Sequence, residues 1–495
     1  MLCRIFSCPE HNIMRILSLT LAVTAAIGLA ACGSNGGPAS GSANNNQGLR
    51  PVAKNVIFFL GDGMGINTTT AARIYSVGED GELTMDTLPE SGFVKTFSND
   101  AQVTDSAPSM SAYMTGVKMN NEVISMSTNT QAKSPNADFT SNCGSGNGQP
   151  VSTLLELAKA GGKATGVVTT TRVTHATPAA TYAHVCHRDA ESDIAAQLVP
   201  GGALYNAKLQ DGVDVVFGGG RQFFLPKAAG GKRADGRDLV AELKAKGYGY
   251  AADKTGFNAL DPAKTNRAVG LFTSSHMSYD LDRDAAKEPS LAEMTAKAIS
   301  MLADRKDKQG FFLMVEGGRI DHALHETTAK KALQDTVAFD QAIKTAIDAM
   351  KQRDPDLKNT LIVVTADHDH TLVLNGYAQR TGKTTPSNPG VLGLVKNYSN
   401  GSVATDADGM PYSIIGFGNG ENRVNGNRNA ATALTDAAVS ANDYHQEAAV
   451  RMPAGGETHG GTDVFIGAIG QGSDAFQGFL ENIDVFGLVK KAAAL

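Results

Sequence analysis

The sequence predicts an α/β fold, with a mostly parallel central sheet and helices on both of its faces. From about residue 52 to residue 373, short apolar runs alternate with amphipathic helical patterns, which is typical of such a sheet. Several of the runs are followed directly by acidic or imidazole side chains. Because ligands of open α/β sheets bind beyond the carboxyl ends of the strands, we expect those side chains to meet in one site.

The most informative run covers residues 311–315, and two carboxylates and two imidazoles follow it within ten residues: Glu316, Asp321, His322 and His325. Asp321 and His325 are four positions apart, so one helical turn brings both to the same side. Carboxylate and imidazole groups together suit zinc, whereas Glu316 suits a harder ion such as magnesium. The segment therefore predicts a metal site after a buried strand.

The same arrangement recurs elsewhere in the chain. Six of the eleven histidines fall in such segments, which favours a multi-metal centre over scattered core histidines. Carboxylates gathered at one sheet edge would repel one another unless cations neutralised them. The further runs are 56–60, followed by Asp62; 361–364, followed by Asp367, His368, Asp369 and His370; and 165–168, followed by His175 and Thr177, while His459 precedes two glycines near the C-terminus.

The remaining elements follow from local patterns. Leu333, Val337 and Ile347 recur at helical spacing and predict one long helix over 325–351. Further strands are predicted at 92–96, 213–217 and 463–469, and further helices at 106–117, 151–160, 290–303 and 479–493.

Residues 376–455 interrupt the alternation of strands and helices. They are rich in Gly, Asn, Ser and Thr, and they separate Asp367 and His368 from His459. We interpret them as an insertion near the mouth of the site. A long loop of this kind in a compact domain is usually functional or a partner surface.

The N-terminal residues have the pattern of an export signal. Arg15 precedes an apolar run that ends in Leu29-Ala30-Ala31-Cys32, which resembles the cleavage box of bacterial lipoproteins. We therefore expect a signal peptide at 1–32, a lipid anchor on Cys32 at the periplasmic side of a bacterial membrane, a flexible tether at 33–50, and one folded domain at 51–495. The alternative is an ordinary cleaved signal and a secreted, soluble protein.

Beyond this signal, Cys143 and Cys186 are the two remaining cysteines. Exported compartments are oxidising, so we expect one disulfide, although the sequence does not show how close the two residues lie. A zinc site is less favoured because the paired spacing of thiolate ligands is missing.

Length and charge narrow the classes of function. The chain of 495 residues is long enough for one large α/β domain with insertions. A net charge of −6 and a pI of about 6.0, with no basic run, give no reason to expect nucleic-acid binding.

Ser106 is the candidate nucleophile. It precedes a helix-compatible stretch with Pro108 in the first turn, where the missing N–H costs nothing. The ordinary interpretation is a helix N-cap. The functional interpretation is a hydroxyl at a helix N-terminus, which is a favourable place for a phosphate.

These motifs in this order resemble the zinc-dependent alkaline phosphatase family, and they span about residues 55 to 470. The fold implied is that of an alkaline phosphatase, and the activity implied is the hydrolysis of phosphate monoesters. The matching segments are Gly61-Asp62-Gly63-Met64-Gly65, Thr104-Asp105-Ser106-Ala107, Val168-Thr169-Thr170-Thr171-Arg172, Val315 to His325, Thr365-Ala366-Asp367-His368 and Thr458-His459-Gly460-Gly461.

By this resemblance, Ser106 becomes a phosphoserine and Arg188 clamps the phosphate. Two zinc ions and one magnesium ion are implied as cofactors. The implied ligands are Asp321, His325 and His459 for one zinc, Asp62, Asp367 and His368 for the other, and Asp62, Thr177 and Glu316 for magnesium, while His175, His322 and His370 are expected behind the ligands, without direct contact to a metal.

The chain departs from the family pattern at several positions. Pro108, Met110 and Ser111 replace small residues and a threonine after the nucleophile, and Cys186 precedes a shortened loop around Arg188. Imidazoles at positions 175 and 322 leave the third metal open between magnesium and a softer ion.

The resemblance also implies an alkaline optimum and a homodimer, for which 376–455 is a candidate interface. Two alternatives stay open. One is a phosphodiesterase on the same scaffold, and the other is a lipid-anchored protein that binds metal or phosphate without turnover.

Overall fold

The computed structural model describes residues 52–495. The signal peptide and the tether expected at 1–32 and 33–50 lie outside the described residues. The described residues form one compact unit. Among the described residues, no helix is both long and apolar enough to cross a membrane.

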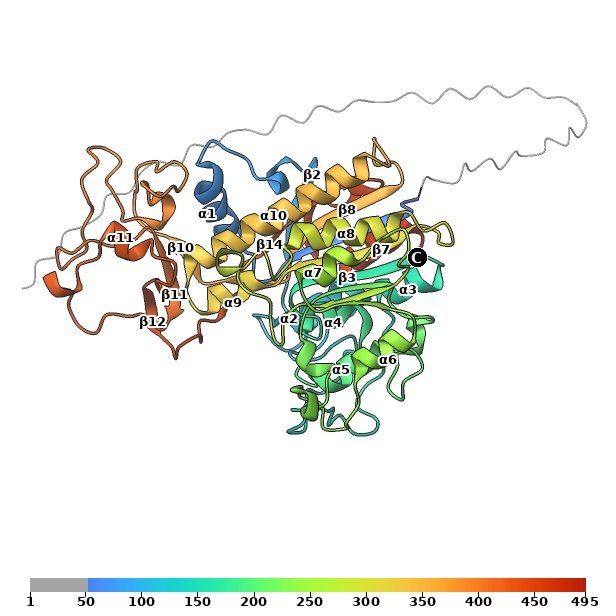
Figure 1. The fold of residues 1–495 in the computed structure, drawn as a ribbon. Coiled ribbons are helices and arrows are strands. Elements are labelled where there is room, and N and C mark those ends of the chain that lie inside the picture. Colours follow the sequence, from blue (N-terminus) through green and yellow to red (C-terminus); the bar gives the residue numbers. More distant parts are fainter. Residues whose placement is uncertain (1–51) are drawn as a thin grey trace, which may run out of the picture. The chain divides into compact units, whose positions relative to one another are not determined.

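A large, mostly parallel sheet forms the centre of this unit (Figure 1). Within residues 52–495 it has ten strands in the order β15-β2-β14-β8-β1-β7-β3-β4-β6-β5. β14 is antiparallel to both of its neighbours, whereas the strands from β8 to β5 pair in parallel. The predicted α/β fold is therefore confirmed.

The strands that the sequence predicts lie close to their predicted positions, whereas those at Gly249–Ala251, Ala268–Leu271 and Gly478–Glu481 were not predicted. In the main sheet the strands are β1 (Asn55–Gly61), β2 (Glu90–Lys95), β3 (Ala164–Arg172), β4 (Val215–Gly219), β5 (Gly249–Ala251), β6 (Ala268–Leu271), β7 (Phe311–Gly317), β8 (Thr360–Ala366), β14 (Val464–Gly470) and β15 (Gly478–Glu481). Two small sheets hold β10 (Leu372–Leu374), β11 (Ile415–Gly420) and β12 (Ala448–Arg451), and β9 (Asp369–His370) with β13 (His459–Gly460).

The helices connect these strands. They are α1 (Ile66–Val77), α2 (Ser106–Thr115), α3 (Leu154–Ala160), α4 (Ala176–Tyr182), α5 (Glu191–Gln197), α6 (Leu239–Ala245), α7 (Lys254–Ala259), α8 (Leu291–Ala303), α9 (Arg319–His325), α10 (Ala329–Lys351), α11 (Asp436–Val439) and α12 (Asn482–Ala493). α8 and α10 lie side by side in Figure 1, while α2 packs against α4 and α12.

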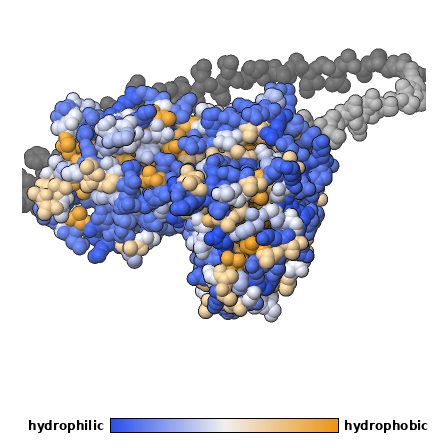
Figure 2. Space-filling view, in the orientation of Figure 1, coloured by the Kyte–Doolittle hydropathy of each residue, from blue (hydrophilic) through white to orange (hydrophobic). Residues whose placement is uncertain are grey.

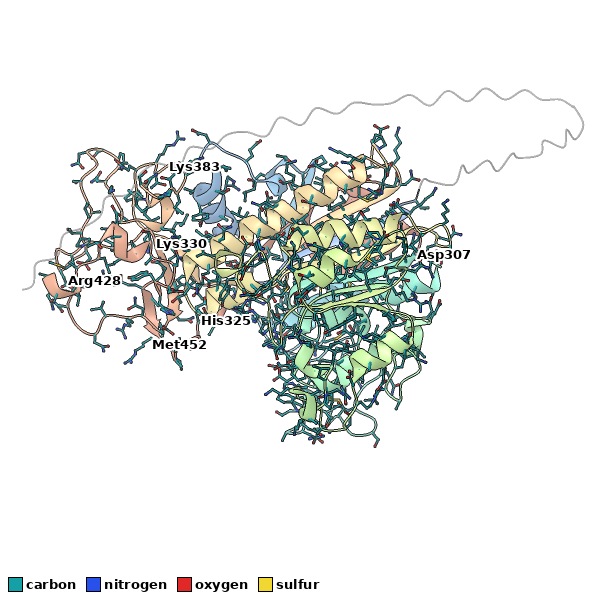
Figure 3. All side chains as sticks on the ribbon, viewed as in Figure 1. Asp307, His325, Lys330, Lys383, Arg428 and Met452 are labelled. Carbon is teal, nitrogen blue, oxygen red and sulfur yellow. A yellow bond between two sulfur atoms is a disulfide. The ribbon has the colours of Figure 1, made fainter. Side chains whose placement is uncertain are left out.

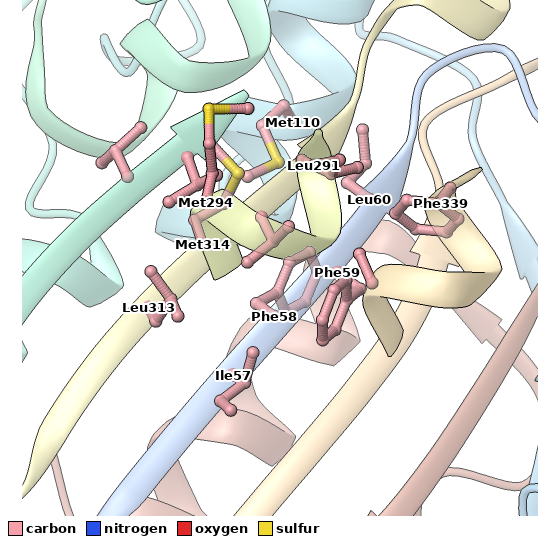
Figure 4. Close-up of a cluster of buried hydrophobic side chains, with 14 of the residues drawn as sticks. Ile57, Phe58, Phe59, Leu60, Met110, Leu291, Met294, Leu313, Met314 and Phe339 are labelled. Atoms are coloured by element: carbon pink, nitrogen blue, oxygen red, sulfur yellow. The ribbon is translucent and has the colours of Figure 1, made fainter. Parts of the chain in front are cut away.

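The central strands are apolar because they are covered on both faces. Every residue of β7 and of β8 is buried. Figure 4 shows side chains of β1 packed against neighbours from β7, α8 and α10, among them Phe59 and Phe339, whose rings meet edge to face with centroids 5.8 Å apart. The surface in Figure 2 is mostly hydrophilic, with scattered apolar residues. Because the central strands are packed on both faces, their carboxyl ends are held in fixed positions.

The helix predicted over 325–351 is interrupted at Glu326–Thr328, and only Ala329–Lys351 is continuous. Thr327 has a positive φ of 56°, which breaks the helical path, and the backbone N–H of Thr328 donates to Ala323 O at 2.9 Å. The C-terminal helix also starts later than predicted, because residues 478–481 extend the sheet as β15.

Phe339 shows how packing holds the carboxyl end of β7. A Cβ added at Gly317 would lie 2.8 Å from the Phe339 ring, so this ring occupies the space beside the last residue of the strand. We expect Phe339→Ala to lower the free energy of unfolding by about 3–5 kcal/mol, because it leaves a cavity at a fully buried site. The urea midpoint should fall accordingly, whereas the exposed control Gln341→Ala on the same helix should leave it unchanged. Equal midpoints would contradict this packing.

Candidate active site and metal centre

The parallel register brings distant acidic residues to one edge of the sheet. Gly61, at the end of β1, pairs with Gly317 of β7 on one side and with Ala366 of β8 on the other. Asp62 directly follows β1, and Asp367 directly follows β8. Carboxylates that lie about 300 positions apart in the sequence therefore converge, as the sequence analysis predicts.

Asp62, Asp367 and His368 form the first cluster, and all three side chains are fully buried. His368 Nε2 lies 3.4 Å from Asp62 Oδ1 and 3.5 Å from Asp367 Oδ2. Ser106 Oγ lies 3.4 Å from Asp62 Oδ1 and 3.3 Å from His368 Nε2. The predicted nucleophile and one predicted ligand set thus share a single pocket.

Asp321, His325 and His459 form the second cluster. His325 Nε2 lies 3.3 Å from Asp321 Oδ1 and 3.2 Å from His459 Nε2, and His459 Nε2 is 3.5 Å from Asp321 Oδ1. The helix α9 places Asp321 and His325 on the same side, and β13 brings His459 beside β9. Figure 3 marks His325 at the end of α9.

The proton positions on these imidazoles suit metal binding. His325 Nδ1 faces Glu457 O, His459 Nδ1 faces Thr104 O at 2.7 Å, and His368 Nδ1 faces Asp369 O at 3.2 Å. A carbonyl oxygen only accepts hydrogen bonds, so each Nδ1 carries the proton and each Nε2 keeps a free lone pair. Ligating histidines are typically held in this way.

A third group of donors has three oxygens, and the ligand atoms of two of their residues, Asp62 and Glu316, also lie within 4.8 Å of a ring nitrogen of His175. Asp62 Oδ2, Glu316 Oε1 and Thr177 Oγ1 are buried, and they have no hydrogen-bond partner among the residues that the structure describes. The other oxygen of Glu316 accepts from Thr169 Oγ1 and, at 3.0 Å, from Thr171 Oγ1. Three free oxygens in a buried pocket fit a hard cation such as magnesium.

The electrostatics of the metal-free pocket are unfavourable. Burial raises the pKa of Asp62 well above its usual range, and the carboxylates of Asp367 and Asp321 raise it further. Burial likewise raises the pKa of Asp367, and it raises that of Glu316 to about 7 against the hydrogen bonds from Thr169 and Thr171. Bound dications would remove this cost by supplying opposite charge.

His370 holds one of the carboxylates in place. Its Nε2 lies 2.8 Å from Asp321 Oδ1, and its Nδ1 lies 2.6 Å from Glu457 Oε2. Although burial opposes protonation, Glu457 and Asp321 raise the pKa of His370 to about 10. Because carboxylate oxygens only accept hydrogen bonds, the ring donates to Asp321 and to Glu457 and holds both in place. The sequence analysis missed Glu457, for which its position two residues before His459 was the available signal.

Three further imidazoles, of His175, His276 and His322, lie close together. Each ring faces an arginine: His175 Nε2 lies 3.0 Å from Arg188 Nη2, His322 Nδ1 lies 3.0 Å from Arg319 Nη1, and His276 Nε2 contacts Arg172 Nη1. Because a guanidinium only donates, it occupies an acceptor nitrogen of each ring, and at His276 the backbone N–H of Arg172 also faces Nδ1 at 3.4 Å. These imidazoles therefore make a poor cation site, despite their spacing. The sequence analysis did not single out His276.

Ser106 and Arg188 depend on Asp105. Asp105, not Ser106, is the N-cap of α2, because its Oδ1 accepts from the backbone N–H of Ala107 at 2.7 Å. The Ser106 hydroxyl is therefore free to face the acidic cluster. Arg188 Nη1 donates to the same Asp105 oxygen at 3.1 Å.

The predicted disulfide is confirmed between Cys143 and Cys186, whose Cα atoms are 5.7 Å apart.

This geometry agrees with comparisons to known proteins. The sequence model of a family described as "Alkaline phosphatase" matches residues 53–495. The chain belongs to the alkaline phosphatase family. As a member of that family it is an enzyme, and its reaction is the hydrolysis of phosphate monoesters.

Curated relatives match along most of their length. The chain is 39% identical over 457 residues to the tissue-nonspecific isozyme of Mus musculus, which covers 85% of this chain and 79% of that protein. It is 35% identical over 470 residues to the membrane-bound alkaline phosphatase of Bombyx mori, with 88% and 78% covered.

Solved structures of the family share the fold. The alkaline phosphatase of Thermus thermophilus aligns with a TM-score of 0.63 and 26% identity over 90% of this chain and 92% of that one. The enzyme of the Antarctic bacterium TAB5 aligns with a TM-score of 0.60 and 24% identity over 90% and 99%. The architecture of this chain is therefore that of an alkaline phosphatase.

The raised pKa of Glu316 predicts a pH dependence for the pocket of Asp62, Thr177 and Glu316. A proton on Glu316 competes with a cation, so magnesium affinity should fall as the pH drops through about 7. For one competing proton, the Kd for magnesium of zinc-loaded protein should rise by up to about tenfold per pH unit as the pH falls below the pKa of Glu316, so it should be higher at about pH 6 than at about pH 8. Titration calorimetry at the two pH values measures this difference. The same Kd at both would contradict a role of Glu316 in this pocket.

Proposed function

We propose that the chain hydrolyses phosphate monoesters to an alcohol and inorganic phosphate through a covalent phosphoserine on Ser106, with two zinc ions, one magnesium ion and an alkaline optimum. The observation that carries the proposal is the position of Ser106 Oγ, 3.4 Å from Asp62 Oδ1 and 3.3 Å from His368 Nε2, at the edge of a buried carboxylate cluster. The family membership supports the reaction class.

The donor sets divide between the proposed metals by their chemistry. Mixed carboxylate and imidazole sets suit zinc, and the set of three oxygens suits magnesium. One zinc would be held by Asp321, His325 and His459, the other by Asp62, Asp367 and His368, and magnesium by Asp62, Thr177 and Glu316. When bound, these dications supply electrostatic stabilisation of the transferring phosphoryl group.

The proposed reaction consists of two successive displacements at phosphorus, the first by Ser106 and the second by water. Ser106 Oγ gives its proton to solvent and attacks phosphorus, so that the Oγ–P bond forms and the ester P–O bond breaks. The departing alkoxide takes a proton from water, and the hydroxide formed is neutralised by the proton that Ser106 released. A water molecule then attacks the phosphoserine, which releases inorganic phosphate and restores the hydroxyl. The guanidinium of Arg188 matches two phosphate oxygens with its planar fork.

Most of the rate acceleration must be electrostatic. Enzymes accelerate phosphate monoester hydrolysis by up to about 10²¹-fold, whereas one general base contributes only about 10²–10⁴-fold. The buried pocket provides the fixed charges that this requires. Asp105, Glu122 and Asp62 raise the pKa of Arg188 although burial opposes its charge, so the clamp stays cationic.

Replacement of the nucleophile tests the proposal directly. We expect Ser106→Ala to lose nearly all turnover of a nitrophenyl monoester while its zinc content, measured by mass spectrometry of the metals, stays unchanged. Ser399→Ala, on an exposed loop, serves as the control and should keep full activity. Unchanged turnover in Ser106→Ala would refute the covalent route. Faster turnover of a bis-nitrophenyl diester than of the monoester by the wild type would indicate a phosphodiesterase.

We also propose that the enzyme is exported and held at the periplasmic side of a bacterial membrane by acyl groups on Cys32, and that it forms a homodimer through residues 376–455. The sequence before Cys32 supports the anchor. The intact mass of protein isolated from membranes should equal that of the chain from Cys32 plus acyl groups. A mature chain without acyl groups in the soluble fraction would show a secreted enzyme instead.

A further inference from the structure

The proposed phosphate clamp lies on a connection without regular structure. Arg188 belongs to residues 183–190, which join α4 to α5. Its side chain is held by Asp105 and His175, as described above, but no helix or strand holds its backbone. The backbone N–H of Arg188 instead donates to Glu122 O at 2.7 Å. The position of the guanidinium therefore depends on the segment that contains Glu122.

That segment is irregular as well. No helix or strand lies between the end of α2 at Thr115 and the start of α3 at Leu154. Glu122, Ser125 and Phe139 have positive φ angles of 73°, 48° and 62°, which are costly for residues other than glycine. Such a segment keeps this conformation only where other contacts hold it in place.

The two irregular segments run along each other. Their contacts comprise the antiparallel bridge Ile124↔Val185 and His184 Nδ1 facing Ser125 O at 2.7 Å. The first segment also contacts α5, because Ser192 N donates to Phe139 O at 3.0 Å and Ser141 N donates to Asp193 Oδ2 at 2.8 Å. The disulfide Cys143–Cys186 is the covalent link between the two irregular segments. Cys186 is fully buried and lies two residues before Arg188. Two residues span at most about 7 Å of chain, so the crosslink acts directly on the clamp.

We propose that the Cys143–Cys186 disulfide positions Arg188 for phosphate binding. The inference rests on the proposed function, in which Arg188 is the phosphate clamp. A crosslink that served stability alone would not need to join two irregular segments beside the site. In this account the disulfide fixes the backbone at Cys186. The β-bridge at Val185 and the hydrogen bond to the Glu122 carbonyl fix the backbone on either side of it. The Asp105 carboxylate then orients the guanidinium of Arg188.

A double-mutant cycle on phosphate binding tests the proposal. The four proteins are the wild type, the double variant Cys143→Ser with Cys186→Ser, Arg188→Ala, and the combination of all three changes. Calorimetry gives the Kd for inorganic phosphate, and zinc content is measured in parallel. We expect the double variant to bind phosphate about tenfold more weakly with unchanged zinc content, because a small misplacement of a clamp is costly. In the Arg188→Ala background, loss of the disulfide should have no further effect.

The outcomes separate this inference from the function on which it rests. An unchanged Kd for phosphate in the double variant would overturn the positioning role of the disulfide. So would a loss of phosphate affinity on removal of the disulfide that is as large in the Arg188→Ala background as in the wild type. In both cases the role of Arg188 in phosphate binding would remain. An unchanged Kd in Arg188→Ala alone would overturn the clamp itself and the inference with it. KM should rise more than kcat falls in the double variant, whereas the remote core variant Met350→Ala, which also lowers stability, should keep the KM of the wild type.

If the double variant does not fold, the same binding measurement is made on folded wild type whose disulfide has been reduced by a water-soluble phosphine. The phosphine is oxidised to its oxide as the two thiols form. A weaker Kd for phosphate with retained zinc supports the proposal, and an unchanged Kd overturns it.

Discussion

The mutual repulsion of buried carboxylates is the constraint on which the rest of this structure depends. Asp62, Asp367, Asp321 and Glu316 are almost completely removed from water and gathered at one edge of a parallel sheet. Burial raises the pKa of Asp62 well above its usual range, and it also raises the pKa values of Asp367 and Glu316. Such a cluster is costly in a folded protein unless metal ions occupy it. The same concentrated charge would serve the proposed phosphoryl chemistry, because it would hold dications that stabilise the transferring group.

The fold positions the residues of this cluster in two ways. Parallel strands set the positions of the carboxylates through their register, and the apolar side chains around β1 and β7 make those positions rigid. Backbone carbonyls and Glu457 then orient the imidazoles, and the Asp105 carboxylate caps the helix that carries the proposed nucleophile and accepts from Arg188. Asp105 thus links the helix that carries Ser106 to the connection that carries Arg188. The buried charges, the hydrogen bonds of Asp105 and the disulfide near Arg188 therefore act on the same few side chains.

Much of the fold and of the candidate site was predictable from the sequence, for a physical reason. Buried parallel strands are nearly continuous apolar runs, so the carboxyl ends before Asp62, Glu316 and Asp367 are visible in the sequence. Features set by tertiary contacts were not visible. The helix break at Thr327 needs a positive φ on a threonine, for which the sequence gives no signal. His276 reaches the site from a loop without periodicity, and only the structure shows that arginines face the rings of His175, His276 and His322.

Anomalous X-ray diffraction from crystals of the purified enzyme, recorded on both sides of the zinc absorption edge, tests the central claim most directly. The account predicts two zinc peaks, one among Asp62, Asp367 and His368 and one among Asp321, His325 and His459, each at about 2.0–2.2 Å from the ligand atoms. It predicts no zinc peak among His175, His276 and His322. Zinc at those three imidazoles, or carboxylate clusters without any metal in an active preparation, would contradict the account.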